Sequence, residues 1–224
     1  MSGTILITGA NGSLAIPGVQ HLLTHYPQYA VILTVRNTSE TDANTKKLRD
    51  IISQHPKANT SIRTLDFSNL SEVHAFANTL AADVANGTLP PLAGIICNAF
   101  YWNLVSGAEL TTDGYEKTFQ VNHIAQAALV LHLIGSFGSG GGRVVLLASD
   151  AHLPGKNGLE KYPPAIPEDL ELLVKPGPDK PVDNFGHGFH RYAVSKLAIV
   201  MWMYALNQHL EQVCVNDINL YSLF

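Results

Sequence analysis

The stretch RYAVSKLA places a tyrosine, Tyr192, four residues before a lysine, Lys196. On a helix this spacing brings both side chains to one face. A nearby ammonium favours the ionised form of a phenol, so we expect Lys196 to lower the pKa of Tyr192 from about 10 toward neutrality. Such a phenol could exchange protons with a bound substrate. The spacing is common on ordinary helices, so its meaning depends on the residues that accompany it.

A glycine-containing loop near the N-terminus is a second candidate site. The residues TGANGSLA follow an apolar stretch and lead into a helical pattern with an early proline, Pro17. A strand, a tight turn and a helix in this order direct backbone N–H groups and the positive end of a helix dipole toward a phosphate. Ser13 and Ala15 stand where glycines are usual. A plain tight turn therefore stays open as the alternative.

Short apolar segments alternate with longer amphipathic ones along the chain. This alternation predicts strands at about 4–8, 31–35, 61–65, 92–97 and 143–148, and helices at about 14–25, 42–54, 70–85, 114–136 and 191–211. Nearly continuous apolar strands between helices are typical of a parallel sheet covered on both faces. We therefore predict one α/β domain over residues 1–224 with a doubly wound, Rossmann-like parallel sheet.

Residues 150–190 interrupt the alternation, because they hold seven of the twelve prolines. The segment is too long for an ordinary connection and too rich in proline for a helix throughout, although PEDLELLV could form a short one. A disordered linker is one interpretation. A lid or substrate-facing insertion is favoured, because the segment lies between two candidate active-site positions.

The composition excludes several classes of protein. With 46% hydrophobic residues and a net charge of −4, the chain fits a globular domain and gives no reason to expect nucleic acid or membrane as a partner. Cys97 and Cys214 offer no disulfide framework, and His187 with His190 lacks a third metal ligand. No signal peptide or membrane-spanning stretch is evident. A cytoplasmic location and no metal are therefore expected.

Taken in order, these residues and four further matches resemble a classical short-chain dehydrogenase/reductase from residue 4 to about 211. The loop from Thr8 to Ala15 approximates the family's TGxxxGxG, and Tyr192 with Lys196 matches its Tyr-x-x-x-Lys. The family's Asp after strand three, Asn-Ala-Gly after strand four, helix Asn and serine after strand five are matched by Asp66, Asn98-Ala99 (with Phe100 in place of glycine), Asn122 and Ser149. The resemblance implies an oxidoreductase that interconverts a carbonyl and an alcohol with a nicotinamide dinucleotide.

The resemblance, together with side-chain chemistry, suggests roles for four residues. Ser149, at the carboxyl end of a strand, could donate to a carbonyl oxygen that gains negative charge as hydride arrives. Tyr192 would give that oxygen its proton, or take it in the reverse direction. The resemblance implies that Lys196 also holds the nicotinamide ribose and that Asn122 holds a water of a proton relay. Alternatively, Ser149 is a simple cap and Asn122 a buried structural amide.

The choice of cofactor rests on the end of the second predicted strand. An acidic residue about 20 positions after the glycines usually binds the ribose 2′-hydroxyl of NAD. Arg36 stands at that place, and no carboxylate comes before Glu40. An arginine suits the 2′-phosphate of NADP, so NADP is predicted unless Arg36 only caps a solvent edge. The predicted cofactor-binding residues are Gly9, Asn11, Ser13, Leu14, Arg36, Asp66, Asn98, Tyr192 and Lys196.

The C-terminus departs from the family pattern. Classical members continue through a sixth strand, a Pro-Gly turn, a substrate-binding segment and a seventh strand, whereas this chain stops at Phe224. The tail 213–224 begins with alternating Val213 and Val215 but loses the apolar phase at Ile218. We therefore expect a truncated sheet without the last family strands. Strand five would lie exposed at its edge, and the apolar face of helix 191–211 would be partly uncovered.

The leading hypothesis is an NADP-dependent oxidoreductase for a moderately large apolar ketone, aldehyde or alcohol. The insertion before RYAVSKLA resembles fungal members of the family, which often act in secondary metabolism. The alternative is a catalytically impaired NADP-binding protein that acts as a sensor or dimer partner. The family resemblance also implies a homodimer. Tyr101 and Trp102 are candidates for the wall of the substrate pocket and, equally, for core packing.

Overall fold

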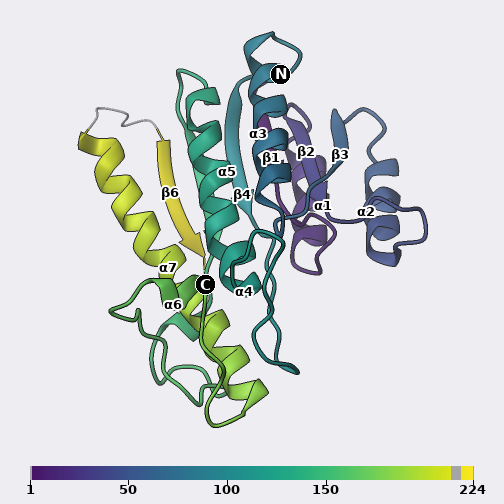
Figure 1. Ribbon diagram of the computed structural model, residues 1–224. Coiled ribbons are helices and arrows are strands. Elements are labelled where there is room, and N and C mark those ends of the chain that lie inside the picture. The colour runs from purple at the N-terminus through teal and green to yellow at the C-terminus, as the bar shows by residue number, and fades with distance from the viewer. Residues whose placement is uncertain (1, 213–217, 224) are drawn as a thin grey trace.

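A sheet of parallel strands forms the centre of the molecule. The computed structural model describes residues 2–212 and 218–223, and within them six strands pair in the order β3-β2-β1-β4-β5-β6. The strands are β1 (Thr4–Ile7), β2 (Ala30–Val35), β3 (Thr60–Thr64), β4 (Leu92–Cys97), β5 (Gly142–Leu147) and β6 (Ile218–Leu223). Every neighbouring pair is parallel. The predicted doubly wound α/β fold is confirmed (Figure 1).

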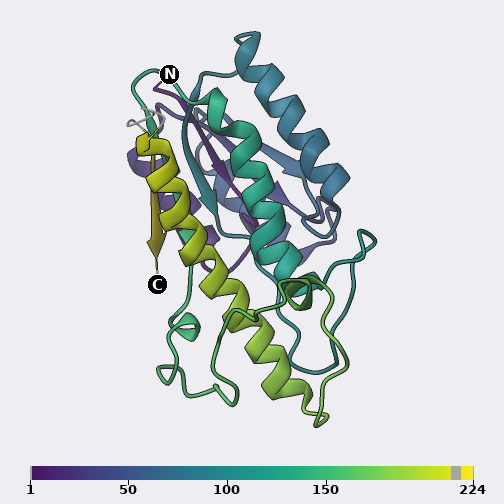
Figure 2. The ribbon, with the colours of Figure 1, turned by 60° about the vertical axis from the view of Figure 1, so that its left-hand side comes forward.

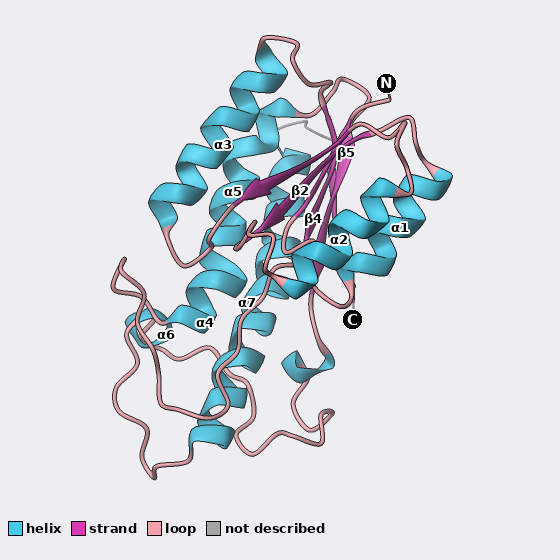
Figure 3. Cartoon of the chain, turned by 90° about the vertical axis from the view of Figure 1, so that its right-hand side faces the viewer, coloured by secondary structure: helices cyan, strands magenta, loops and turns pink. Residues whose placement is uncertain are grey.

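Helices cover both faces of the sheet (Figure 3). One face packs against α1 and α2 through a core that includes Val19 and Leu48. The other face packs against α3, α5 and α7 through a larger core that includes Leu129 and Met203. The helices are α1 (Ala15–His25), α2 (Ala43–Ser53), α3 (Leu70–Ala85), α4 (Lys117–Phe119), α5 (Ala125–Leu133), α6 (Glu171–Val174) and α7 (Asn184–Gln212), with shorter turns η1 (Gln120–Ile124), η2 (Ile134–Ser136) and η3 (Asp150–His152).

The order of the strands reverses between β1 and β4. β1 pairs with β2 on one side and with β4 on the other. In open α/β sheets, ligands bind beyond the carboxyl ends of the strands at such a reversal. The loops that follow β1, β2, β4 and β5 therefore converge where the sequence placed its candidate residues.

Helix α7 is longer than the sequence predicted. It begins at Asn184 rather than near residue 191 and has 29 residues. Two glycines in its first turns argue against helix by propensity alone, but the N–H of Gly186 donates to Oδ1 of Asp183 at 3.0 Å and fixes the start. At Gly188, an added Cβ would lie 2.0 Å from the carbonyl oxygen of Asn103. No helix in the described ranges has both the length and the apolar character required to cross a membrane.

The helix predicted over 114–136 is interrupted. It begins at Lys117 and contains a turn of π-helix, η1, before α5 continues. A π-turn widens the helix locally and often accompanies a functional site. Here it carries Asn122, which is buried.

The proline-rich insertion 150–190 packs beside the first half of α7 (Figure 2). Its short predicted helix is present as α6, over the last four residues of PEDLELLV. An ion pair connects the insertion to the helix, because Nη1 of Arg191 donates to both carboxylate oxygens of Asp179, at 2.9 and 3.0 Å. Nζ of Lys161 adds a second contact, 3.0 Å from Oδ2 of Asp183. These contacts order the insertion, so the disordered-linker interpretation is not supported.

The expectation that strand five forms the sheet edge is wrong. β6 pairs with β5 from Gly142–Ile218 to Leu147–Leu223 and becomes the edge itself. Ile218 and Leu220 are buried, and Asn207 of α7 exchanges two hydrogen bonds with the backbone of Leu220, at 3.1 and 3.0 Å. Ile218, where the apolar alternation of the tail seemed to be lost, is the first residue of this strand. Val213 and Val215, predicted to alternate as a strand, lie outside the described residues.

Candidate functional site

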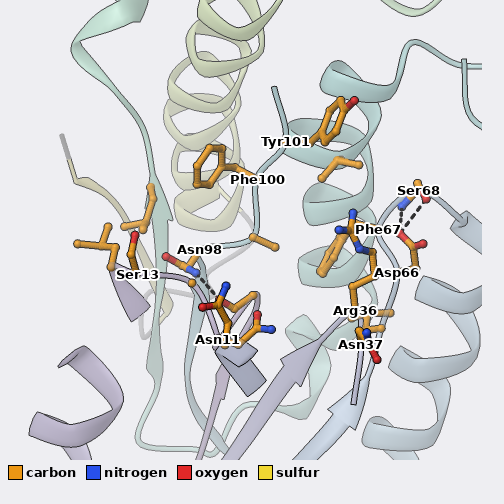
Figure 4. A pocket seen from close by; sticks show the side chains of 18 of the residues that line it. Asn11, Ser13, Arg36, Asn37, Asp66, Phe67, Ser68, Asn98, Phe100 and Tyr101 are labelled. Carbon is orange, nitrogen blue, oxygen red and sulfur yellow. Dashed lines mark hydrogen bonds between the residues drawn. The ribbon is translucent and has the colours of Figure 1, made fainter. Parts of the chain in front are cut away.

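A cavity of about 510 Å³ lies beyond the carboxyl ends of the central strands. Figure 4 shows Ser13 and Asn98 toward one side of it and Arg36 with Asp66 toward the other. All nine residues predicted to bind the cofactor line this cavity: Gly9, Asn11, Ser13, Leu14, Arg36, Asp66, Asn98, Tyr192 and Lys196. Of the four predicted catalytic residues, Tyr192 and Lys196 line it directly. Ser149 and Asn122 are not among the residues that line it.

The loop after β1 is held against the end of β4. The hydroxyl of Thr8 accepts hydrogen bonds from the backbone N–H groups of Asn98 and Ala99, both at 3.0 Å. In return, Nδ2 of Asn98 donates to the carbonyl oxygen of Gly9 at 2.8 Å. Gly9 has a φ of +61°, and a Cβ there would lie 2.8 Å from Cα of Ala99. Only glycine combines this backbone conformation with this close approach.

The first turn of α1 lacks a side-chain cap. Leu14 stands at the N-cap and its side chain caps none of the N–H groups of that turn, although the N–H of Ile16 donates to the carbonyl oxygen of Gly12 at 3.0 Å. Such groups are otherwise satisfied by caps, water or ligands, and together with the helix dipole they form a site for an anion. Ser13 and Leu14 are exposed at this turn. The imperfect glycine pattern therefore still folds as a strand, a tight turn and a helix N-terminus in that order.

The end of β2 presents an unpaired cation. Arg36 is exposed and lines the cavity, and among the described residues no hydrogen bond or ion pair holds its guanidinium. Glu40, the nearest carboxylate in sequence, is 3.4 Å from Nη1 of Arg49 instead. The guanidinium of Arg36 is therefore available for an anionic ligand.

Sequence reasoning missed a carboxylate in this region, Asp42. It lines the cavity and caps α2, where its Oδ1 accepts from the N–H of Thr45 at 2.7 Å. This bond and others lower the pKa of Asp42, so it stays ionised. Its capping position before a helical pattern could have revealed it. Asp66 also lines the cavity and is held by the N–H and hydroxyl of Ser68, at 2.8 and 2.7 Å.

Tyr192 and Ser149 come together at the end of the cavity. Burial raises the pKa of Tyr192 above its ordinary value, a hydrogen bond with Ser149 acts in the opposite direction, and the carboxylate of Asp150 adds to the rise. The expectation of a lowered pKa is therefore wrong for the protein without a ligand. Ser149 is also tied to its neighbour, since its hydroxyl donates to Oδ1 of Asp150 at 3.2 Å.

The position of Lys196 explains this difference. Its Nζ lies 5.6 Å from the centre of the Tyr192 ring, so the two side chains share one side of α7 as predicted. The ammonium, however, donates to the carbonyl oxygen of Leu147 at 2.6 Å. Lys196 is 4% exposed, and burial lowers its pKa to about 8. Lys196 therefore stays mostly protonated at neutral pH, with its charge directed to the end of β5.

Asn122 holds two segments together. Its Nδ2 donates to the carbonyl oxygen of Tyr101 and to the hydroxyl of Ser195, both at 2.9 Å. Its Oδ1 accepts from the N–H of Tyr101 at 2.7 Å. These bonds agree with the alternative of a structural amide. The water relay implied by the resemblance stays a prediction.

Aromatic rings surround Tyr192. The ring of Trp102 packs edge-on against it with centroids 5.3 Å apart, and the ring of Phe100 lies 6.2 Å from it. Tyr101 differs from its neighbours, because it packs partly on the core and its hydroxyl donates to Oε2 of Glu109 at 3.0 Å. Sequence analysis identified Phe100 only as a departure from the family motif and did not predict its position at the site.

Known proteins are similar to this chain in sequence. Residues 3–166 match the family model described as the KR domain. The short-chain dehydrogenase iccH of Talaromyces variabilis is 31% identical over 157 residues, which cover 67% of this chain and 41% of iccH. The short chain dehydrogenase macD of Penicillium terrestre is 28% identical over 217 residues, which cover 93% of this chain and 61% of macD. This chain thus spans less than two thirds of either relative.

A solved structure shows the same fold. The NADPH-bound carbonyl reductase from chicken fatty liver superposes with a TM-score of 0.66 at 19% identity, over 98% of this chain and 77% of that chain. At this identity the likeness concerns the fold alone. It agrees with the parallel sheet described above.

Proposed function

The chain belongs to the short-chain dehydrogenase/reductase family, and from this membership we propose that it interconverts a ketone or aldehyde and an alcohol with NADP(H). One observation carries the proposal. Tyr192, hydrogen-bonded to Ser149, and Lys196 lie at the end of the same cavity that begins at the glycine loop. A proton donor thus faces the place where a dinucleotide would end.

The cavity residues fit a dinucleotide. The uncapped first turn of α1 suits its pyrophosphate. Gly9 lets the loop after β1 approach the end of β4 closely, since an added Cβ there would lie 2.8 Å from Cα of Ala99. Arg36, which has no partner among the residues that the structure describes, suits a 2′-phosphate through paired N–H donors. Asp42 stands in the same lining and would favour an unphosphorylated ribose, so the choice between NADP and NAD needs a direct test.

The residues around the reacting atoms have distinct roles. A bound nicotinamide supplies or accepts the hydride. Tyr192 holds the proton at its phenol oxygen, and its raised pKa keeps it protonated at neutral pH, which suits donation to a carbonyl. Ser149 orients the carbonyl oxygen once its hydroxyl leaves Asp150. Lys196, protonated below a pH of about 8, would stabilise negative charge on the phenol once its ammonium leaves Leu147. The reductive direction is therefore proposed.

The cofactor preference is tested by Arg36→Ala. If Arg36 binds a 2′-phosphate, its loss removes charge-assisted hydrogen bonds of about 1.5–3 kcal/mol, and NADPH affinity falls roughly 10- to 100-fold while NADH affinity stays. Affinities are measured from the change in cofactor fluorescence on binding. The control is Lys46→Ala, which removes one positive charge at an exposed position of α2. An equal effect on both cofactors, or none, contradicts the assignment.

The activity itself is tested with purified protein and a panel of ketones. We expect NADPH to raise the unfolding midpoint, because it binds only the folded form, and to be consumed with at least one ketone. A raised midpoint with no consumption would favour the second candidate, a catalytically impaired NADP-binding protein. The hydrogen bonds that hold the Lys196 ammonium on Leu147 and the Ser149 hydroxyl on Asp150 favour that candidate. An unchanged midpoint at saturating NADPH would contradict both.

Two further proposals concern the setting of the protein. We propose a homodimer, because Leu131 of α5 and Met201 and Tyr204 of α7 expose apolar surface. Sedimentation at micromolar concentration tests it, and a monomer throughout would contradict it. We also propose the cytoplasm as the location, a compartment that suits the free thiol of Cys97. Imaging of a tagged protein tests this.

A further inference from the structure

Two aromatic side chains at the site lack the cover that aromatic residues normally have. Phe100 is 56% exposed and Trp102 is 44% exposed. Their rings lie edge to face with centroids 6.3 Å apart, and each also approaches the ring of Tyr192. Large apolar groups exposed together beside a candidate proton donor indicate a binding surface.

The segment that carries these rings is fixed. The backbone of Tyr101 accepts from and donates to the amide of Asn122, at 2.9 and 2.7 Å. The side chain of Tyr101 turns away toward Glu109, and Figure 4 shows its ring apart from that of Phe100. Phe100 and Trp102 face the same side, because their ring centroids lie 6.3 Å apart. The two rings are therefore pre-organised rather than loose.

The following residues reinforce this arrangement. Oδ1 of Asn103 accepts from the N–H groups of Val105 and Ser106, both at 3.1 Å. The carbonyl oxygen of Asn103 sits where a Cβ of Gly188 would be. The segment is thus clamped at both ends, by Asn122 and by α7. A rigid aromatic surface loses little freedom when a ligand stacks on it.

The charges near the rings favour a neutral ligand. Nζ of Lys196 lies 5.7 Å from the centre of the Phe100 ring, on the side of the cavity. Asp150 is the carboxylate whose charge reaches Tyr192. Lys117 of the same lining is paired with Glu109, 3.1 Å away. These charges of both signs leave little net attraction for a charged substrate. Shape and stacking would therefore decide what binds.

We propose that Phe100 and Trp102 form a stacking surface that selects flat, conjugated ketones over saturated ones of the same size. The inference rests on the proposed function, because it places the substrate carbonyl at Tyr192. A saturated ring gains only the burial of apolar surface, whereas a conjugated ring also gains aromatic pairing. That extra pairing corresponds to a preference of roughly 2- to 12-fold for each well-stacked pair.

A matched pair of bicyclic ketones tests the selection. 1-Tetralone and trans-1-decalone share a fused ten-carbon skeleton, but only 1-tetralone has an aromatic ring. Because the two carbonyls differ in reactivity, the quantity compared is the kcat/KM ratio of the ketones in each variant relative to wild type. We expect Trp102→Leu and Phe100→Leu each to shift this ratio against 1-tetralone, by roughly 2- to 12-fold. Leu131→Ala, at an exposed position of α5, should leave it unchanged. Equal ratios in all variants overturn the proposal.

A binding measurement keeps the test independent of turnover. The chain has two tryptophans, so Trp202→Phe leaves Trp102 as the sole tryptophan fluorophore. With NADP⁺ present, 1-tetralone should quench the Trp102 emission saturably. Displacement of bound 1-tetralone by trans-1-decalone should require a concentration of trans-1-decalone several-fold higher than that of 1-tetralone. Equal affinity, or no saturable quenching, overturns the stacking surface. Discriminating binding with no consumption of NADPH by any ketone would instead overturn the proposed function and leave the stacking surface standing.

Discussion

Replacement of Gly188 by alanine tests the contact between α7 and the segment after β4. An added Cβ would lie 2.0 Å from the carbonyl oxygen of Asn103 and 3.0 Å from its carbonyl carbon. Both are backbone atoms, so neither can swing aside as a side chain would. Overpacking of this kind costs about 1–3 kcal/mol, and a backbone clash belongs at the upper end. Alanine also favours a helix over glycine by about 1 kcal/mol. The expected net decrease in the free energy of unfolding is about 2 kcal/mol.

Thermal unfolding measures this loss. For a chain of this size, about 2 kcal/mol corresponds to a fall in Tm of roughly 4–8 °C. Gly158→Ala is the control, because no atom lies within 4 Å of its added Cβ. If helix propensity alone mattered, Gly188→Ala would raise the Tm instead. A Tm equal to or above that of the wild type would refute the proposed contact.

Two further predictions concern the proton donor and the last strand. Asp150→Asn should lower the pKa of Tyr192, because the carboxylate raises it. Tyr192 must be protonated to donate a proton. Ketone reduction by the variant should therefore be lost at a lower pH than reduction by the wild type. An unshifted pH–rate profile would argue against this coupling. Asn207→Ala should destabilise the protein by about 1–3 kcal/mol, because it removes both hydrogen bonds to Leu220. Chemical denaturation checks this against Asn219→Ala, at an exposed position of β6, and equal losses would mean that Asn207 does not hold the strand.

The sequence predicted the first five strands closely because each is a short apolar run between helices. It failed where long-range contacts decide the structure. Helix α7 starts at Asn184 despite Gly186 and Gly188, and the need for glycine at 188 arises from a residue far away in sequence, Asn103. β6 was missed because its alternation begins only at Ile218, close to the end of the chain.

The residues of the candidate site were predictable from the sequence, whereas the pKa shifts of these residues were less so. The motif residues line one cavity, because the carboxyl ends of parallel strands converge. The direction of the pKa shift of Tyr192 was not predictable, since it depends on burial and on the bond from Lys196 to Leu147. Asp42 and Phe100 were missed because their importance comes from their position in the cavity rather than from a motif.

The central claim is that Tyr192 donates the proton in an NADPH-dependent reduction. The most direct test compares wild type with Tyr192→Phe, which keeps the ring and removes only the hydroxyl. NADPH affinity and NADPH oxidation by a ketone substrate are measured on the same preparations. We expect similar affinity in both proteins and loss of oxidation in the variant by roughly 100-fold or more. Oxidation at the wild-type rate by Tyr192→Phe would contradict the account.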